Sequence, residues 1–173
     1  FSETDAKKLA KSSGWFFALD SGRGWRRMVA SPKPKKILDL PTIDALLEAG
    51  VIPIACGGGG VPVVITPEGH LKGVAAVIDK DLTSAMLAAH LHADALIMLT
   101  GVEKVALDFN KPTQRWLDHM TLAEARQYST EGQFPAGSMG PKIESAITFL
   151  EESPEANGNG VVFKVGRDGT GFK

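Results

Sequence analysis

Two patterns of apolar positions alternate along the chain, one with the spacing of a helix and one of short continuous runs. Apolar residues recur at helical spacing over 42–50, and a continuous apolar run follows over 51–56. The same order returns over 81–92 and 95–99. Runs of this length are typical of strands covered on both faces. The repeated order of helix and buried strand predicts an α/β chain with a mostly parallel sheet and helices on each side.

Turn and cap residues predict the remaining elements. Ser2 and Asp5 form a capping-box pattern before a short helix that Gly14 ends. The stretches 15–20 and 25–30 alternate around a glycine turn, which predicts a hairpin. Further predicted elements are a hairpin around the turn Pro67–His70, a helix after the capping box of Thr121 and Glu124, a helix with Pro141 at its first position, and a last strand over Val161–Val165.

Composition narrows the class of protein. With 43% apolar residues in a chain of 173, the sequence predicts one soluble folded unit rather than a disordered one. The 19 basic and 20 acidic residues give a net charge of −1, which disfavours nucleic acid or an anionic membrane as a partner. No apolar run reaches the roughly 18 residues of a membrane span, and no signal peptide is expected. The N-terminal sequence, without an initiating Met, predicts that the chain begins within a longer protein.

Cysteine and histidine content offers no metal or nucleophile candidate. The single cysteine, Cys56, excludes an internal disulfide and a multi-cysteine zinc site, so a reducing compartment, the cytoplasm, is the simplest prediction. Cys56 ends the apolar run over 51–56 and is expected to be a small core residue. His90 and His92 are two residues apart and fall on different faces of the predicted helix, so they are not a ligand pair.

A run of four glycines, Gly57–Gly60, follows the predicted strand over 51–56. Because these residues lack Cβ atoms, the backbone N–H groups of such a turn can approach an anion closely. The spacing matches neither the dinucleotide-binding fingerprint nor the Walker A pattern. The glycines therefore indicate either a turn that binds phosphate or carboxylate, or a plain tight turn.

Two lysines stand where helices are predicted to begin. Lys80 lies between Asp79 and Asp81, after a strand predicted over Val74–Ile78, at the edge where open α/β sheets bind ligands. A fixed lysine there can stabilise a transferring phosphoryl group, but on these residues alone the favoured interpretation is a solvated charge run in which Asp81 caps the helix. Lys142 falls in the first turn of the helix that Pro141 opens, where a cation is unfavourable unless an anion joins it. An ordinary scaffolding loop remains the alternative.

Six segments occur along the chain in the order GRGWRRMVASPKP, ACGGGGVPV, AVIDKDLTSAMLA, ADALIMLTGV, FNKPTQ and EGQFPAGSMGPKIESAI. Together they closely resemble the carbamate kinases of the amino-acid kinase family, over residues 1–149. The resemblance implies a three-layer α/β/α sandwich, here incomplete, and reversible phosphoryl transfer between carbamoyl phosphate and ADP that gives ATP and carbamate. It further implies Mg²⁺ with ATP or ADP, a homodimer, and a role in arginine metabolism.

The resemblance also implies roles for single residues. Lys80 and Lys142 resemble the lysines that contact the transferring phosphoryl group, and Asp81 resembles the carboxylate that orients them. The turn Gly57, Gly58, Gly59 and Gly60 resembles the loop on the substrate side. Positions bordering the nucleotide are Asp79, Thr100, Val102 and Met139. Attack is direct and in line, so we expect no side-chain nucleophile, and no side chain is expected to be a metal ligand.

The family's members carry a further N-terminal half with a Gly-Gly-Asn phosphate loop and another lysine. We therefore expect residues 1–66 to be the remainder of the substrate-side lobe with a small β-hairpin. Residues 67–173 are expected to be a nucleotide-binding lobe, truncated at its C-terminal end, and activity is expected only with the N-terminal half. Gly101 and Ala106 depart from the family's pattern. They favour the alternative, a non-catalytic nucleotide-binding or dimerisation module derived from the same fold.

Overall fold

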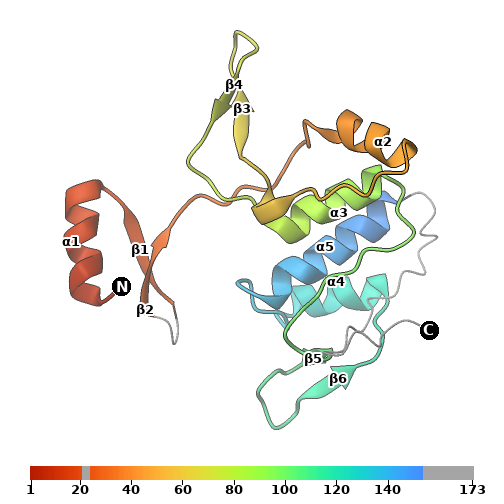
Figure 1. The fold of residues 1–173 in the computed structure, drawn as a ribbon. Coiled ribbons are helices and arrows are strands. Elements are labelled where there is room, and N and C mark those ends of the chain that lie inside the picture. The colour runs from red at the N-terminus through yellow and green to blue at the C-terminus, as the bar shows by residue number, and fades with distance from the viewer. Residues whose placement is uncertain (21–23, 154–173) are drawn as a thin grey trace. The chain divides into compact units, whose positions relative to one another are not determined.

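The computed structural model describes residues 1–20 and 24–153, which form two compact units (Figure 1). The first unit consists of residues 1–32 and 61–78. The second unit consists of residues 33–60 together with the chain from residue 79 onward. Every candidate site residue from the sequence therefore lies in the second unit.

The first unit is one helix and two hairpins. Helix α1 (Glu3–Ser13) is capped by the Ser2 side chain, which accepts the Asp5 N–H, and it ends at Gly14 in the left-handed conformation with φ 66°. Both predicted caps are confirmed. The hairpins are antiparallel, and their strands are β1 (Phe16–Asp20) with β2 (Gly24–Met28), and β3 (Val63–Ile65) with β4 (Leu71–Gly73).

The second unit is mainly helical. Helix α2 begins two residues before the predicted start at Thr42, and Gly50, with φ 75°, follows its end. The capping box of Thr121 and Glu124 at the start of α4 is confirmed. The elements of this unit are α2 (Leu40–Glu48), the 3₁₀ turn η1 (Gly57–Gly59), α3 (Lys80–His90), β5 (Val105–Leu107), β6 (Arg115–Leu117), α4 (Leu122–Thr130) and α5 (Met139–Glu152).

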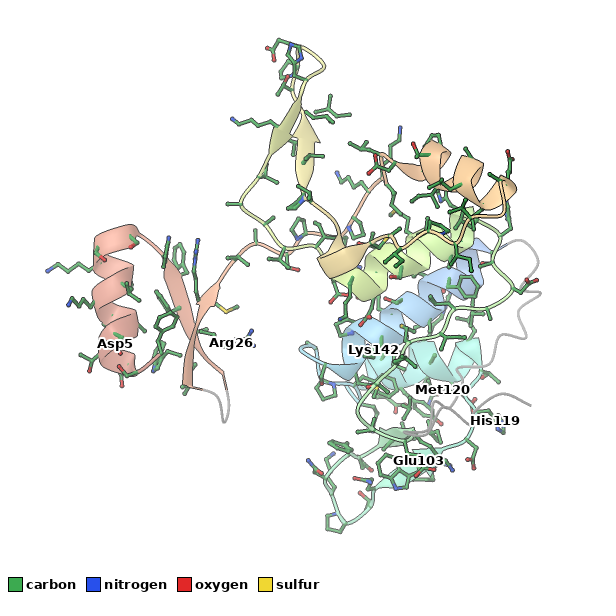
Figure 2. The ribbon with its side chains drawn as sticks, viewed as in Figure 1. Asp5, Arg26, Glu103, His119, Met120 and Lys142 are labelled. Atoms are coloured by element: carbon green, nitrogen blue, oxygen red, sulfur yellow. The ribbon has the colours of Figure 1, made fainter. Side chains whose placement is uncertain are left out.

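Helix α5 joins two apolar clusters of the second unit. In one cluster Phe149 packs against the alanines of α3. In the other cluster Ile143, only 1% exposed, packs with residues of α4, β5 and the loop that holds Met120, which Figure 2 labels. Because α5 is anchored on both sides, its first turn is held in a defined place relative to α3.

Three runs predicted to be strands are not strands in this structure. Residues 51–56 and 95–99 have no ladder partner among the described residues, and 74–78 contributes only the parallel bridge between Ala30 and Ala76. Ile54 is fully exposed and Ile52 is 90% exposed. A strand requires N–H and C=O partners from a neighbouring strand, and an apolar run does not specify which segment supplies them. The sheets formed by the described residues are the three antiparallel pairs.

The start of α5 also differs from the prediction. Helix α5 begins at Met139, so Pro141 is its third residue rather than its first.

Two further predictions are not tested by the structure. The predicted strand over Val161–Val165 lies outside the described residues, and the division into lobes at residue 66 stays a prediction. Within the described ranges, no helix combines the length and apolar composition that crossing a bilayer requires.

Candidate active site

The structure brings Lys142 and Asp81 together across 61 residues of sequence. The Lys142 Nζ lies 3.0 Å from the Asp81 Oδ2, and the two side chains are 18% and 12% exposed. The Lys80 Nζ lies 3.7 Å from the other carboxylate oxygen, Oδ1, on a side chain that is mostly exposed. One buried carboxylate thus pairs with two ammonium groups, and this lysine–aspartate cluster carries one net positive charge.

The N-termini of two helices meet at this cluster. Asp81 is the second residue of α3. Lys142, which is labelled in Figure 2, is the fourth residue of α5. The two helices pack side by side, through Ala85 and Ala89 of α3 and Phe149 of α5 (Figure 1). Helix N-termini carry partial positive charge, so their convergence adds to the attraction for an anion.

Asp79, rather than Asp81, is the cap of α3. The Asp79 Oδ1 accepts the N–H groups of Asp81 and Leu82 at 2.8 and 3.3 Å. The interpretation of Asp81 as the cap is therefore wrong, since its carboxylate is engaged by lysines instead. The reason is geometric: the cap accepts from residues two and three positions ahead, and α3 begins one residue earlier than predicted.

The glycine run forms a tight 3₁₀ turn. Gly58 and Gly59 have φ values of 62° and 89°, and Gly60 has φ 86° with ψ 169°, a region that only glycine adopts readily. The amides of Gly59 and Gly60 donate to carbonyls within the turn, at 3.0 and 3.1 Å. Among the described residues, the amides of Gly57 and Gly58 have no hydrogen-bond partner. They are the donors that an anion could use.

Cys56 precedes the turn in the left-handed conformation, with φ 58°. It is half-buried, and burial raises the pKa of its thiol, so the thiol stays protonated near neutral pH. This protonation state fits the expectation that Cys56 is not a nucleophile.

Of the residues predicted to border the nucleotide, Asp79 hydrogen-bonds the Asp81 amide, but no polar contact among the described residues joins Thr100, Val102 or Met139 to the lysine–aspartate cluster. Thr100 and Val102 are half-buried, and no hydrogen bond or ion pair links either residue to Lys142 or Asp81 within the described part of the chain. The Met139 side chain packs against the apolar cluster around Ile143. Roles for these three residues in nucleotide binding stay predictions.

The first turn of α5 nevertheless offers a backbone donor beside this cluster. Ser138 gives no side-chain cap, the Gly140 amide donates to the Pro135 carbonyl at 2.9 Å, and Pro141 has no N–H. Within the described residues the Met139 amide has no backbone or side-chain acceptor, so it is an open donor of that turn.

Sequence reasoning missed one contact of this region. The hydroxyl of Thr83, on α3, lies 3.1 Å from the carbonyl oxygen of Gly59 in the turn. A threonine inside a helix carries no signal of a partner 24 residues earlier in the chain. Only the packing of η1 against α3 reveals it.

A helix-terminal cluster of lysines beside a glycine turn, in a chain of helices and strands, is typical of α/β proteins that bind phosphate groups. The chain belongs to the amino-acid kinase family. The family model described as "Amino acid kinase family" matches residues 5–156.

Proteins similar to the chain are carbamate kinases and carbamate kinase-like proteins. It is 51% identical over 151 residues to a carbamate kinase of Thermococcus kodakarensis, covering 87% of this chain and 48% of the relative. It is 50% identical over 153 residues to the carbamate kinase-like protein YahI of Escherichia coli, covering 88% and 48%. The chain thus spans about half the length of the curated relatives it matches.

Solved structures agree on the fold. A carbamate kinase from Giardia lamblia bound to AMP-PNP superposes with a TM-score of 0.76 at 38% identity, over 88% of this chain and 48% of that one. A protein from Aeropyrum pernix gives 0.78 at 45% identity, over 88% and 49%. The α/β amino-acid kinase fold that the sequence predicts is confirmed.

Proposed function

We propose that the chain is the part of a carbamate kinase-like phosphotransferase that holds the transferring phosphoryl group. The reaction is reversible transfer between carbamoyl phosphate and ADP, giving ATP and carbamate. The observation that carries the proposal is the cluster in which Asp81 holds both Lys142 and Lys80. The similarity to carbamate kinases, which extends over about half of their length, supports the same reaction.

The cluster suits charge stabilisation rather than covalent catalysis. In the direction that forms ATP, an oxygen of the ADP β-phosphate attacks the phosphorus of carbamoyl phosphate, and the bond from that phosphorus to the carbamoyl oxygen breaks. The electron pair of that bond leaves with carbamate. Charge spreads over the peripheral phosphoryl oxygens, where Lys142 and Lys80 supply fixed positive charge. Asp81 keeps the Lys142 ammonium in place before substrate arrives, which lowers the cost of reorganisation.

Backbone donors on either side of the cluster complete the proposed site. The open amides of Gly57 and Gly58 suit the phosphate or carboxylate of the substrate side. The Met139 amide at the start of α5 suits a phosphate of the nucleotide, as expected for a helix N-terminus. The adenosine is proposed to lie near Thr100 and Val102.

Mg²⁺ is proposed to enter with the nucleotide. The described residues hold no group of three or more His, Cys, Asp or Glu side chains placed to share a metal ion. Mg²⁺ is commonly held by substrate phosphates and water together with one or two carboxylates. Because Asp79 caps α3 and Asp81 pairs with two lysines, we propose that the nucleotide phosphates, rather than these side chains, supply its ligands. When bound, the ion neutralises charge on the nucleotide phosphates.

The cellular setting rests on the resemblance alone. We propose a homodimer in the cytoplasm with a role in arginine metabolism, and we propose that full activity depends on the other half of the relatives' length.

The alternative function is that of a module that binds nucleotide without turnover. The half-length match favours this alternative where the other half is not supplied.

The test is ATP formation from carbamoyl phosphate and Mg-ADP by the purified chain. It is run alone and together with the N-terminal half of the Thermococcus relative. Lys142→Met should reduce turnover by about 10²–10³, the range for loss of one preorganised charge-stabilising donor. Lys7→Met is the matched control, because Lys7 pairs with Glu3 on the exposed face of α1. Equal turnover in both variants would refute the proposal, and ADP binding without turnover would favour the binding module.

A further inference from the structure

The hydroxyl of Thr83 sits between two carbonyl oxygens. It lies 3.1 Å from the Asp79 oxygen, one turn back in α3, and 3.1 Å from the Gly59 oxygen. Thr83 is 5% exposed and Gly59 is buried. The bond to Asp79 is the usual back-bond of a helical threonine, whereas the contact with Gly59 ties α3 to a different segment of the chain.

The two carbonyls differ in how much they depend on this hydroxyl. The Asp79 oxygen also accepts the Thr83 N–H at 3.1 Å. For the Gly59 oxygen, the Thr83 hydroxyl is the one donor among the described residues. A hydroxyl has a single proton, so the bond to Gly59 and the back-bond to Asp79 share it or alternate. Removal of the hydroxyl would leave a buried carbonyl unpaired at Gly59 alone.

The turn that carries Gly59 has little stiffness of its own. Gly58, Gly59 and Gly60 all have positive φ and no side chains to pack, so many other backbone conformations are open to this loop. A contact from outside the turn is therefore needed to hold it in one place. Thr83 provides that contact from the same helix turn that carries Lys80 and Asp81.

We propose that Thr83 is a positioning residue. Its hydroxyl fixes the glycine turn Gly57–Gly60 relative to Lys80 and Asp81, so that the open amides of the turn and the lysines meet one substrate. The proposal rests on the proposed function for the identity of that substrate, carbamoyl phosphate. The link between turn and helix does not depend on the identity of the substrate.

The experiment compares Thr83→Val, which keeps the shape and removes the hydroxyl, with Thr83→Ser, which keeps the hydroxyl. Amide hydrogen exchange at Gly59 and Gly60 should be about 2- to 12-fold faster in the valine variant, the change that one net hydrogen bond corresponds to. The serine variant should match the unmodified chain. The Kd for carbamoyl phosphate should rise by a similar factor in the valine variant, with the Kd for ADP unchanged.

Thr130→Val is the matched control. The Thr130 hydroxyl makes the same back-bond, to the Arg126 oxygen at 3.0 Å, at an exposed position of α4, and it has no second acceptor among the described residues. It should leave exchange at Gly59 and Gly60 unaltered. Unaltered exchange at these glycines in Thr83→Val would overturn the proposal. Faster exchange spread equally over α3 and α5 would also overturn it, since that is a loss of general stability.

The two proposals fail in different ways. If the unmodified chain binds no carbamoyl phosphate, with or without the N-terminal half of a relative, the proposed function fails. Hydrogen exchange in Thr83→Val and Thr83→Ser then decides the positioning role by itself.

Discussion

The pairing of Lys142 with Asp81 should be measurable as a coupling free energy in unfolding. Lys142→Met keeps a long unbranched side chain and removes the ammonium, and Asp81→Asn keeps the shape and removes the charge. At 3.0 Å, an effective dielectric constant of about 20 gives a gross attraction of about 5–6 kcal/mol. Desolvation of both groups opposes most of this attraction, because the side chains are only 18% and 12% exposed.

The net coupling should therefore lie between that of surface pairs and that of fully buried pairs. Surface pairs contribute about 0–1 kcal/mol, and breaking a buried pair costs about 3–5 kcal/mol. Lys80 remains 3.7 Å from the carboxylate in the Lys142 variant and offsets part of the loss. We expect a coupling of about 1–2 kcal/mol for Lys142 with Asp81.

The assay is urea unfolding of the unmodified chain, both single variants and the double variant, followed by circular dichroism. Arg126→Met with Glu151→Gln is the control cycle, because this pair joins α4 and α5 of the same unit on side chains 60% and 35% exposed. A Lys142–Asp81 coupling no larger than the control coupling would refute the reasoning that partial burial strengthens the pair.

Three further outcomes follow from other parts of the chain. Ile143→Ala should cost about 2–5 kcal/mol of unfolding free energy, against about 0.5–1.5 for Ile143→Val, because this side chain is 1% exposed; equal losses would contradict its place in the core. Two hydrogen bonds from Thr121 lower the pKa of Glu124; the one from its N–H has the larger effect, and the one from its hydroxyl the smaller. This contribution to stability is present above the unfolded-state pKa and lost as pH falls through the lower folded pKa. Thr121→Val keeps the N–H and removes the hydroxyl, so an NMR titration should find the Glu124 pKa raised relative to the unmodified chain; an unchanged value would contradict the hydrogen bond from the hydroxyl. Ile52→Lys with Ile54→Lys should reduce self-association in light scattering, since both side chains are almost fully exposed; unchanged association would place the contact elsewhere.

Local signals in the sequence were sufficient for three helix ends. Ser2, Gly14 and Thr121 act on backbone groups within a few residues of themselves, and all three caps lie where the pattern predicts them. The exact start of α5 differs because Pro141 is tolerated at several positions of the first turn.

Long-range pairing was much harder to predict. The runs over 51–56 and 95–99 have the composition of buried strands, but composition does not name a hydrogen-bond partner, and the described residues supply none. Lys80, Asp81 and Lys142 were predicted as a set through the resemblance, and in the structure the Asp81 carboxylate lies 3.7 and 3.0 Å from the two ammonium groups. Their chemical roles remain proposals.

The central claim is that Lys142 and Lys80, held by Asp81, contact the transferring phosphoryl group. The most direct test is a crystal structure of the chain with AMP-PNP and Mg²⁺, prepared with the N-terminal half of a relative if the chain alone does not bind. We predict an oxygen of the terminal phosphate at about 3 Å from the Lys142 Nζ, the distance of a charge-assisted hydrogen bond. A terminal phosphate bound away from both lysines, with the Lys142–Asp81 pair unaltered, would contradict it.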